Sequence, residues 1–261
     1  MFGFSRIRRR RRALEEPFPE AWIALLEQHL VHWGLLDPDE RSRLQDLIRL
    51  FLVDKRWQAA RGFELTDDIR VLISAMACLL ILELDYGYYE PVRWIEVHPT
   101  TVTRTGTRGV GVAGVVTDAP MPILGEASFE GPVVIAWDAA ASGARHPERG
   151  HNVVYHEFAH KLDMDDRLID GTPRLVDPAA RQRWIEVCTA EFDALRRGHG
   201  GPLLDPYGGV NPGEFFAVAT ELFFDRPRAM QQAKPELYDV LRGFYLQDPA
   251  ERERRAGHRP R

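Results

Sequence analysis

The 261-residue sequence has only two cysteines, Cys78 and Cys188, which are too few for a disulfide framework. Cys78 lies in the apolar run VLISAMACLLIL, where a buried thiol is the simplest interpretation. This run, residues 71–82, is the longest apolar stretch, and it is too short to span a bilayer. The basic start of the chain is not followed by an apolar segment with a cleavage site, so we predict no signal peptide. These absences favour a soluble protein of the reducing cytoplasm.

The sequence also lacks an excess of positive charge, because 34 Lys and Arg residues are set against 39 Asp and Glu residues. The formal net charge is −5, yet residues 1–16 carry +4 and residues 250–261 carry +3. The remaining, acidic body argues against broad nucleic-acid binding, which needs a basic face. We predict a disordered basic tail at 1–16 and a basic C-terminal tail at 250–261. The alternative is that the arginines at 8–12 contact RNA, anionic lipid or an acidic partner.

Residues 17–90 have the periodicity of helices. Apolar residues recur at helical spacing around Leu44, Leu47 and Phe51, and Asp37 followed by Pro38 is typical of a helix start. The segment TDDIRVLISAMACLLILEL predicts a further helix, capped by Thr66 or Asp67 and apolar nearly all round. Such a helix is expected at the centre of the core.

The period changes after residue 90. PVRWIEVHPTTV alternates as a strand, and MPILGEASFEGPVVIAW predicts two strands around a turn near Glu130 and Gly131. The Gly-rich stretch TGTRGVGVAGVVTDAP is expected to be a loop without the context of a phosphate loop. Helical periodicity returns from about His151. The order predicts a mostly helical α+β fold with a small mixed or antiparallel sheet, in which region 17–90 packs on a core formed by 91–249.

The segment YHEFAHKLD has the spacing of a metal site on a helix. His156 and His160 are four residues apart and share a face, so their imidazoles can reach one ion, and two such nitrogens suit zinc. Glu157 then lies beside the ion, where it can take a proton from water. The alternative is an ordinary helix with two half-buried histidines. We interpret Asp163 as an acceptor that orients a histidine, the alternative being a surface Asp near the helix end.

A third ligand is expected in DPYGGVNPGEFFAVATELFFDRP. Asn211 and Pro212 mark a helix start, and Glu214 falls in its first turn before an apolar run. One interpretation is that a carboxylate there only interacts favourably with the positive end of the helix dipole. A glutamate that faces inward from so apolar a helix would need a cation to balance its charge. We therefore predict Glu214 as the third ligand. Glu221 lies two turns further on the same face and is predicted to orient a histidine.

Tyr207 precedes Glu214 by seven residues in a Gly-rich turn. A phenol near the metal can donate a hydrogen bond to the oxyanion that forms when water attacks a carbonyl. A tyrosine that only packs is an equal alternative. The other histidines, His32 among them, have no partner pattern and are interpreted as loop or surface residues, with His151 near the rim of the site.

HEFAHKLD, the later Y…EFFAVATELFF and the closing PELYDVLRGFYLQDP together resemble the Mlc titration factor A family of bacterial zinc peptidases, from about Phe18 to Pro249. The catalytic core of that family is similar to the zincin-like core of anthrax lethal factor. The resemblance implies one Zn²⁺ ion bound by His156, His160 and Glu214, with Glu157 as general base and Tyr207 stabilising the transition state. The Arg-rich ends lie outside it.

The resemblance also implies an activity and a partner. The activity is aminopeptidase-like cleavage of small peptides, and the partner is a Mlc-type repressor of sugar uptake. The alternative function is a non-catalytic protein that sequesters a transcription regulator, with a structural or latent zinc site. The hairpin LGEASFEGPVVIAW is expected either to offer a sheet edge to an extended peptide substrate or to be purely structural.

Overall fold

The structure is a computed structural model that describes residues 2–60, 62–100, 131–163 and 170–257, together with the backbone of short strands between residues 102 and 127. Most of the described chain is helical, and the main sheet has four strands in the order β1-β2-β8-β7. The Gly-rich stretch lies largely outside the described residues, as does part of the turn expected near Glu130. None of the described helices combines the length and apolar character needed to cross a membrane.

The N-terminal third is built mainly from helices, and these begin where the sequence predicts. Asp37 caps α4 and forms a reciprocal capping box with Glu40, and Thr66 caps α5 by accepting from the amide of Ile69. α5 is buried along nearly its whole length, as its apolar sequence requires. The helices of this part are α1 (Phe2–Glu15), α2 (Glu20–His29), α3 (Val31–Leu35), α4 (Pro38–Asp54), α5 (Asp67–Leu80) and the 3-10 helix η1 (Tyr86–Tyr89).

The sheet is mixed. β1 (Arg56–Ala59), β2 (Trp94–His98) and β8 (Val133–Ala136) run parallel, and β7 (Gly125–Ala127) pairs antiparallel with β8 as the edge strand. The strand at 94–98 and the pair β7–β8 confirm two predictions. Four short strands form two further antiparallel pairs: β3 (Val102–Arg104) with β6 (Met121–Ile123), and β4 (Arg108–Gly109) with β5 (Val116–Thr117).

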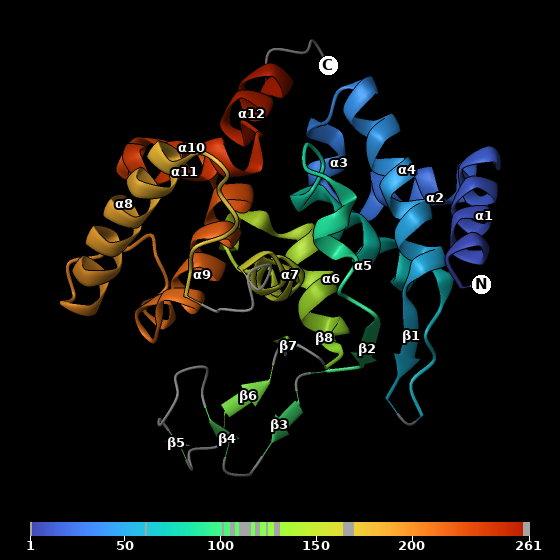
Figure 1. Ribbon diagram of the computed structural model, residues 1–261, viewed down its shortest axis with the longest axis horizontal. Coiled ribbons are helices and arrows are strands. Elements are labelled where there is room, and N and C mark those ends of the chain that lie inside the picture. Colours follow the sequence, from blue (N-terminus) through green and yellow to red (C-terminus); the bar gives the residue numbers. More distant parts are fainter. Residues whose placement is uncertain are drawn as a thin grey trace.

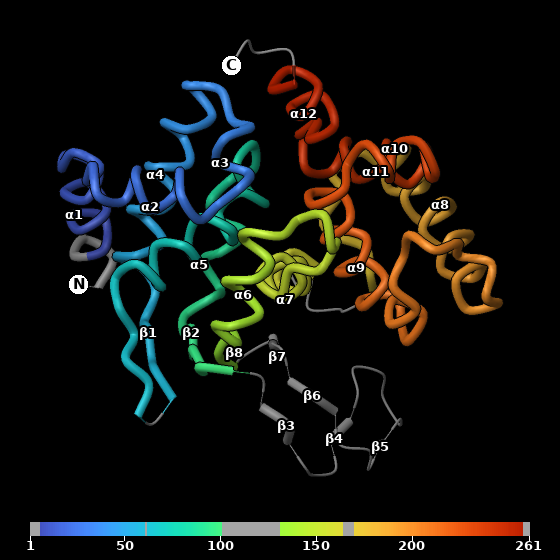
Figure 2. The backbone as a smooth tube through the Cα atoms, turned by 180° about the vertical axis from the view of Figure 1, so that it is seen from behind, coloured from blue at the N-terminus to red at the C-terminus, as the bar shows by residue number. Residues whose placement is uncertain are grey.

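The second half of the chain is helical again. α7 lies at the centre, with α1, α2 and α4 on one side of it and α8, α10 and α11 on the other, as both views show (Figures 1 and 2). Its elements are α6 (Trp137–Arg145), η2 (Pro147–Arg149), α7 (Val153–Asp163), α8 (Pro178–Arg196), η4 (Pro206–Gly209), α9 (Pro212–Asp225), α10 (Pro227–Ala233), α11 (Pro235–Tyr245) and α12 (Pro249–Gly257).

α7 is the most enclosed helix of this half, because it packs against α9, α5, β7 and β8. Its apolar side chains Val154, Phe158 and Leu162 are fully buried. The Phe158 ring lies edge-on to Tyr89, with ring centroids 5.0 Å apart, which joins α7 to the N-terminal third. The central position of α7 fixes the polar side chains on its remaining face.

Three features of the structure differ from the sequence predictions. Residues 2–15 form helix α1, which packs on α4 through Arg6 and Arg10, where a disordered tail was expected. Residues 56–59 form strand β1 within the region expected to be helical, because their backbone pairs with β2, a contact that local periodicity does not reveal. Near the C-terminus, where a basic tail was predicted from residue 250, Pro249–Gly257 form helix α12. Arg252 of this helix is buried and donates to Glu40 and Gln247.

Candidate metal centre

The helix α7 is held at its start by Asn152. The Asn152 side-chain oxygen accepts from the amides of Val154 and Tyr155, both at 3.2 Å, which satisfies two of the free amides at a helix N-terminus. Asn152 is fully buried, and its own backbone amide donates to Glu221 Oε2 at 2.6 Å. The start of α7 is therefore tied directly to α9.

The helix α9 begins at the other side of the site. The Asn211 side chain accepts from the amide of Glu214 at 2.9 Å, and Pro212 occupies the first turn, as the sequence predicts. Nearly every residue from 215 to 225 is buried. This packing holds Glu214 in the first turn with its carboxylate toward α7.

His156, His160 and Glu214 converge on one point. The Glu214 Oε2 atom lies 3.0 Å from His156 Nε2 and 3.4 Å from His160 Nε2. One potential ligand atom from each residue lies within 4.8 Å of the other two. Two imidazole nitrogens and one carboxylate oxygen at this separation are the ligand set of a catalytic zinc site. The three residues therefore fit a single metal ion.

Glu221 lies behind the first of these histidines. Its Oε1 atom lies 2.8 Å from His156 Nδ1 and accepts the proton carried there. This hydrogen bond leaves Nε2 of His156 directed at Glu214 and available to an ion, which is the role of an outer carboxylate behind a metal-binding histidine. His160 lacks such support, because its buried Nδ1 has no hydrogen-bond partner among the described residues.

The two histidines differ in their electrostatic surroundings. Burial opposes a positive charge on His156, but hydrogen bonds to Glu214 and Glu221 outweigh it and raise the pKa of His156 well above its usual value. Burial lowers the pKa of His160. Burial also opposes ionisation of Glu214, yet hydrogen bonds from His156 and His160 hold the pKa of Glu214 far below its usual value. Glu214 is therefore an anion that a cation in the cluster would stabilise.

Glu157 and Tyr207 lie beside the cluster. Glu157 is buried, with 3% of its surface exposed, and its charge raises the pKa values of both His156 and Tyr207. The Tyr207 ring centroid is 6.0 Å from that of His156, and the side chain is 39% exposed. Burial and then the charges of Glu214 and Glu157 raise the pKa of Tyr207, so its phenol is a neutral hydrogen-bond donor.

Tyr207 owes its position to a short capped turn. Asp205 precedes η4 and accepts from the amide of Tyr207 at 2.8 Å, and η4 packs on α9. The exposed His151 lies close to this turn, with its Nε2 atom 3.7 Å from Asp205 Oδ2, and its predicted place at the rim of the site stays a prediction. The turn places the tyrosine next to His156, with part of its surface exposed to solvent.

Asp163 lies at the end of α7 and is buried. Its Oδ2 atom accepts from the amide of Gly171 at 3.0 Å. Gly171 has φ of +75°, and a Cβ atom there would lie 2.4 Å from the Pro212 carbonyl oxygen, so only glycine fits. Asp163 thus helps to join the end of α7 to the start of α9. Its predicted role as an acceptor for a histidine stays a prediction.

The structure brings six of the seven predicted site residues into one group, and places Asp163 at the neighbouring helix end. Asn152 is a site residue that the sequence predictions missed. The sequence does contain a pattern that indicates its capping role, since an Asn immediately before an apolar run at helical spacing is typical of an N-cap. Its hydrogen bond to Glu221 had no such signal, because the two residues are 69 positions apart.

Comparison with known proteins agrees with this geometry. The sequence profile of the family described as glucose-regulated metallo-peptidase M90 matches residues 4–246. That match includes most of α1, which the resemblance drawn from the motifs left out.

Relatives match over similar lengths. An uncharacterized protein of Synechocystis sp. is 36% identical over 246 residues, covering 92% of this chain and 89% of the relative. Mlc titration factor A of Edwardsiella ictaluri is 31% identical, covering 92% of this chain and 91% of the relative. The protein of the same name in Klebsiella pneumoniae is 30% identical, covering 85% and 84%.

Proposed function

The chain belongs to the glucose-regulated metallo-peptidase M90 family, and from this premise we propose that it is a zinc-dependent, aminopeptidase-like metallopeptidase that hydrolyses short peptides. The observation that carries the proposal is the convergence of His156 Nε2, His160 Nε2 and Glu214 Oε2. We propose one zinc ion per chain, held by these three residues. In this proposal α7 is the active-site helix of a zincin-like core.

The bound ion would supply a Lewis acid that polarises the scissile carbonyl and lowers the pKa of water toward about 7. Glu157 takes the proton from the attacking water and passes it to the leaving amine. The Tyr207 phenol donates to the oxyanion that develops on the carbonyl oxygen. Glu221 keeps His156 in the orientation and tautomer that the ion needs. A metal site that is only structural needs neither a base nor an oxyanion donor, which favours the enzyme.

A peptide substrate also needs a surface that holds it extended. β7 is the edge strand of the main sheet and packs against α7. An extended peptide can add to such an edge through main-chain hydrogen bonds. We propose that the substrate pairs with the side of β7 that faces away from β8, which has no partner strand among the described residues, and so passes along α7.

The test is hydrolysis of a mixed short-peptide pool by zinc-loaded protein, beside Glu157→Gln with equal zinc content. We expect the wild type to cleave and the variant to lose about 100- to 10,000-fold of the rate, which is the usual contribution of a general base. Equal cleavage by the two proteins would remove Glu157 from the mechanism. No cleavage by either, with zinc bound in both, would favour the second candidate function.

That second function is binding of a transcription regulator. Two of the relatives described above carry the name Mlc titration factor A. This name supports a Mlc-type repressor of sugar uptake as the partner. We propose that this binding accompanies peptidase activity and does not need the metal. A pulldown of the repressor with zinc-loaded and zinc-free protein tests the point. Retention of the repressor without zinc would separate binding from catalysis, and loss of it would tie the two together.

A further inference from the structure

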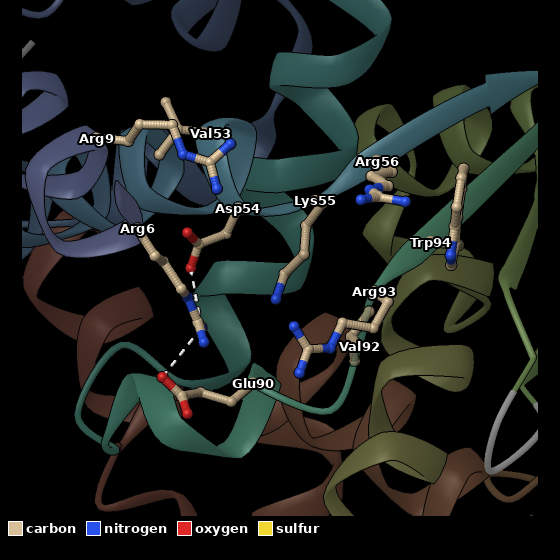
Figure 3. Close-up of a pocket in the computed structure, with 10 residues that line it drawn as sticks. All are labelled: Arg6, Arg9, Val53, Asp54, Lys55, Arg56, Glu90, Val92, Arg93 and Trp94. Atoms are coloured by element: carbon tan, nitrogen blue, oxygen red, sulfur yellow. Dashed lines mark hydrogen bonds and ion pairs between the residues drawn. The ribbon is translucent and has the colours of Figure 1, made fainter. Parts of the chain in front are cut away.

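A second polar cavity lies away from the metal centre. Its volume is about 330 Å³, and it is bounded by α1, the end of α4, the end of η1 and the starts of β1 and β2 (Figure 3). None of the residues of the metal cluster lines it. Five of its ten lining residues are basic: Arg6, Arg9, Lys55, Arg56 and Arg93.

Folding brings these basic residues together from three parts of the sequence. β1 and β2 are parallel, and Arg56 lies opposite Trp94 in their register, so the two strands start side by side. Lys55, Arg56 and Arg93 therefore lie at the same end of the sheet, where these two strands start. Helix α1, which packs on α4, adds Arg6 and Arg9 to the lining; these two are three residues apart and share a helix face.

The two acidic residues of the cavity already have partners. Asp54 Oδ2 accepts from Arg6 at 3.3 Å and from Arg10 Nε at 2.9 Å. Glu90 Oε1 accepts from the same two arginines, at 3.0 and 3.1 Å. These contacts hold α1 on the body of the protein. Burial lowers the pKa of Lys55 to about 8, and the charge of Asp54 opposes that effect, so Asp54 also acts on the ammonium group.

Four cations remain. In the part of the chain that the structure describes, neither Arg9, Arg56 nor Arg93 forms an ion pair with a carboxylate. Lys55 is 6% exposed, and its ammonium group donates to the carbonyl oxygen of Tyr89. Figure 3 shows Lys55 and Arg93 pointing toward one another across the cavity. Lys55 is buried, whereas Arg9, Arg56 and Arg93 are exposed. Solvent screens part of the repulsion between Lys55 and Arg93, and an anion held between them would interact favourably with both.

We propose that this cavity binds a small molecule that carries a phosphate ester. A phosphate group carries close to two negative charges and three strong acceptor oxygens, which match an ammonium and several guanidinium groups. The volume lies at the lower end of the range of small-molecule pockets. The cavity is too small for a macromolecule, and the chain as a whole is acidic, with a net charge of −5.

Trp94 distinguishes an ester from inorganic phosphate. Its side chain lines the cavity and is 41% exposed, with the Arg56 guanidinium 5.0 Å from the ring centroid. The aromatic surface offers the organic part of the ligand a contact that a bare phosphate ion cannot use. The phosphate group would lie between Lys55, Arg93 and Arg9, with the organic part along Trp94.

The experiment is calorimetric titration of the full chain, at low ionic strength, with inorganic phosphate, glucose 6-phosphate and phenyl phosphate. We expect at least one ester to bind more tightly than inorganic phosphate. Arg9→Gln and Arg93→Gln should each weaken the binding by about tenfold or more, because each removes a charged hydrogen bond. The matched control is Arg8→Gln, since Arg8 neighbours Arg9 on α1 but does not line the cavity.

Two results would overturn the proposal. The first is no binding of any of the three probes, and the second is equal weakening by Arg8→Gln and by the two cavity variants. Inorganic phosphate that binds as tightly as both esters would overturn the assignment to an ester. Trp94→Ala gives an independent check, because it should weaken the esters while leaving inorganic phosphate unchanged.

Discussion

Two histidines of this protein have the same types of neighbour and yet differ in chemistry. His156 and His32 each lie against a carboxylate from α9 and near a tyrosine ring. For His156 these are Glu221 and Tyr207. For His32, a residue predicted to lie in a loop or on the surface, they are Asp225 and Tyr155.

The His32 group is closed. His32 Nε2 donates to the Phe224 carbonyl at 3.1 Å, and Nδ1 lies 3.3 Å from the Tyr155 hydroxyl, so both ring nitrogens are used. Tyr155 is fully buried, and burial lowers the pKa of His32 to about 4. Burial also raises the pKa of Asp225 well above its usual value, with the charge of Glu221 adding to the effect. His32 of α3, Tyr155 of α7 and Asp225 of α9 thus form an uncharged buried group that connects the three helices.

The His156 group differs in three respects. It has a second carboxylate, Glu214, whose hydrogen bond helps to raise the pKa of His156 well above its usual value against the effect of burial. It has a second histidine, His160, whose Nε2 atom faces the same oxygen of Glu214. Its tyrosine, Tyr207, is partly exposed, and His156, His160 and Glu214 each keep a part of the side chain exposed to solvent. What distinguishes a metal site from a buried polar joint is therefore how many donors converge and whether a ligand can reach them.

The largest expected effect comes from removing a carboxylate of α9. Glu214→Ala should abolish stoichiometric zinc binding, because it removes one of three ligands. Asp225→Asn should leave zinc content unchanged, because the buried acid is neutral and the amide has nearly its shape. Metal analysis of the two purified variants is the measurement. Full zinc occupancy in Glu214→Ala would remove Glu214 from the ligand set.

The next effect concerns the two tyrosines. Tyr207→Phe should lower the rate of peptide hydrolysis by about 100- to 1,000-fold with zinc content unchanged, the usual cost of one oxyanion donor. Tyr155→Phe should instead reduce the free energy of unfolding by about 1 kcal/mol, since it removes a buried hydrogen bond, and leave the rate near that of the wild type. Steady-state kinetics and urea unfolding separate the two. A wild-type rate in Tyr207→Phe would make Tyr207 a packing residue.

We expect His32 to make the free energy of unfolding depend on pH. Because its folded pKa, about 4, lies below the unfolded value of 6.5, the unfolded chain binds the proton first as pH falls. The stability contribution is fully present above pH 6.5 and is lost as pH falls toward 4, about 3 kcal/mol in all. Urea unfolding of metal-free wild type and His32→Gln at pH 7 and pH 4 should show this difference. Equal pH dependence in the two proteins would contradict it.

The smallest of these effects is expected at Glu221. Glu221→Gln keeps the shape of the side chain but removes the charge behind His156, so zinc affinity should fall by about 10- to 100-fold. Competition with a chelator of known affinity measures the change. The comparison predicts no such fall for Asp225→Asn, although both residues lie on the same helix. An unchanged affinity in Glu221→Gln would show that position, not charge, is what His156 needs.

The sequence predicted the local elements well where a short pattern carries the information. The caps at Asp37, Thr66 and Asn211 are visible in a few letters, and the structure confirms them. The strand β1 was missed, because its four residues acquire their form only by pairing with β2, 38 positions away. Helix α1 was missed because an arginine run has no apolar face of its own, and its order depends on Asp54 and Glu90.

For the candidate site, the residue types and their spacing on one helix were enough to single out His156, Glu157 and His160. Glu214 and Glu221 followed from an acidic face on an apolar helix. For Tyr207 the residues alone left a packing role equally open, and the role at the site came from the family resemblance. Asp163 was placed near the histidine face by its spacing, and the structure adds a contact that spacing does not indicate, the hydrogen bond from the amide of Gly171 to Asp163 Oδ2. His32 shows the opposite limit, since nothing next to it in the chain indicates burial.

The sequence by itself determined where the helices begin, which ligand types are present and which of them share a face, because helix geometry relates residues three or four apart without reference to the rest of the chain. Only the tertiary structure decided which histidine meets two carboxylates and which meets one. It also decided that five scattered basic residues line one cavity. Those contacts join residues tens of positions apart, and their energies depend on burial and on distances that exist only after the helices and strands have packed.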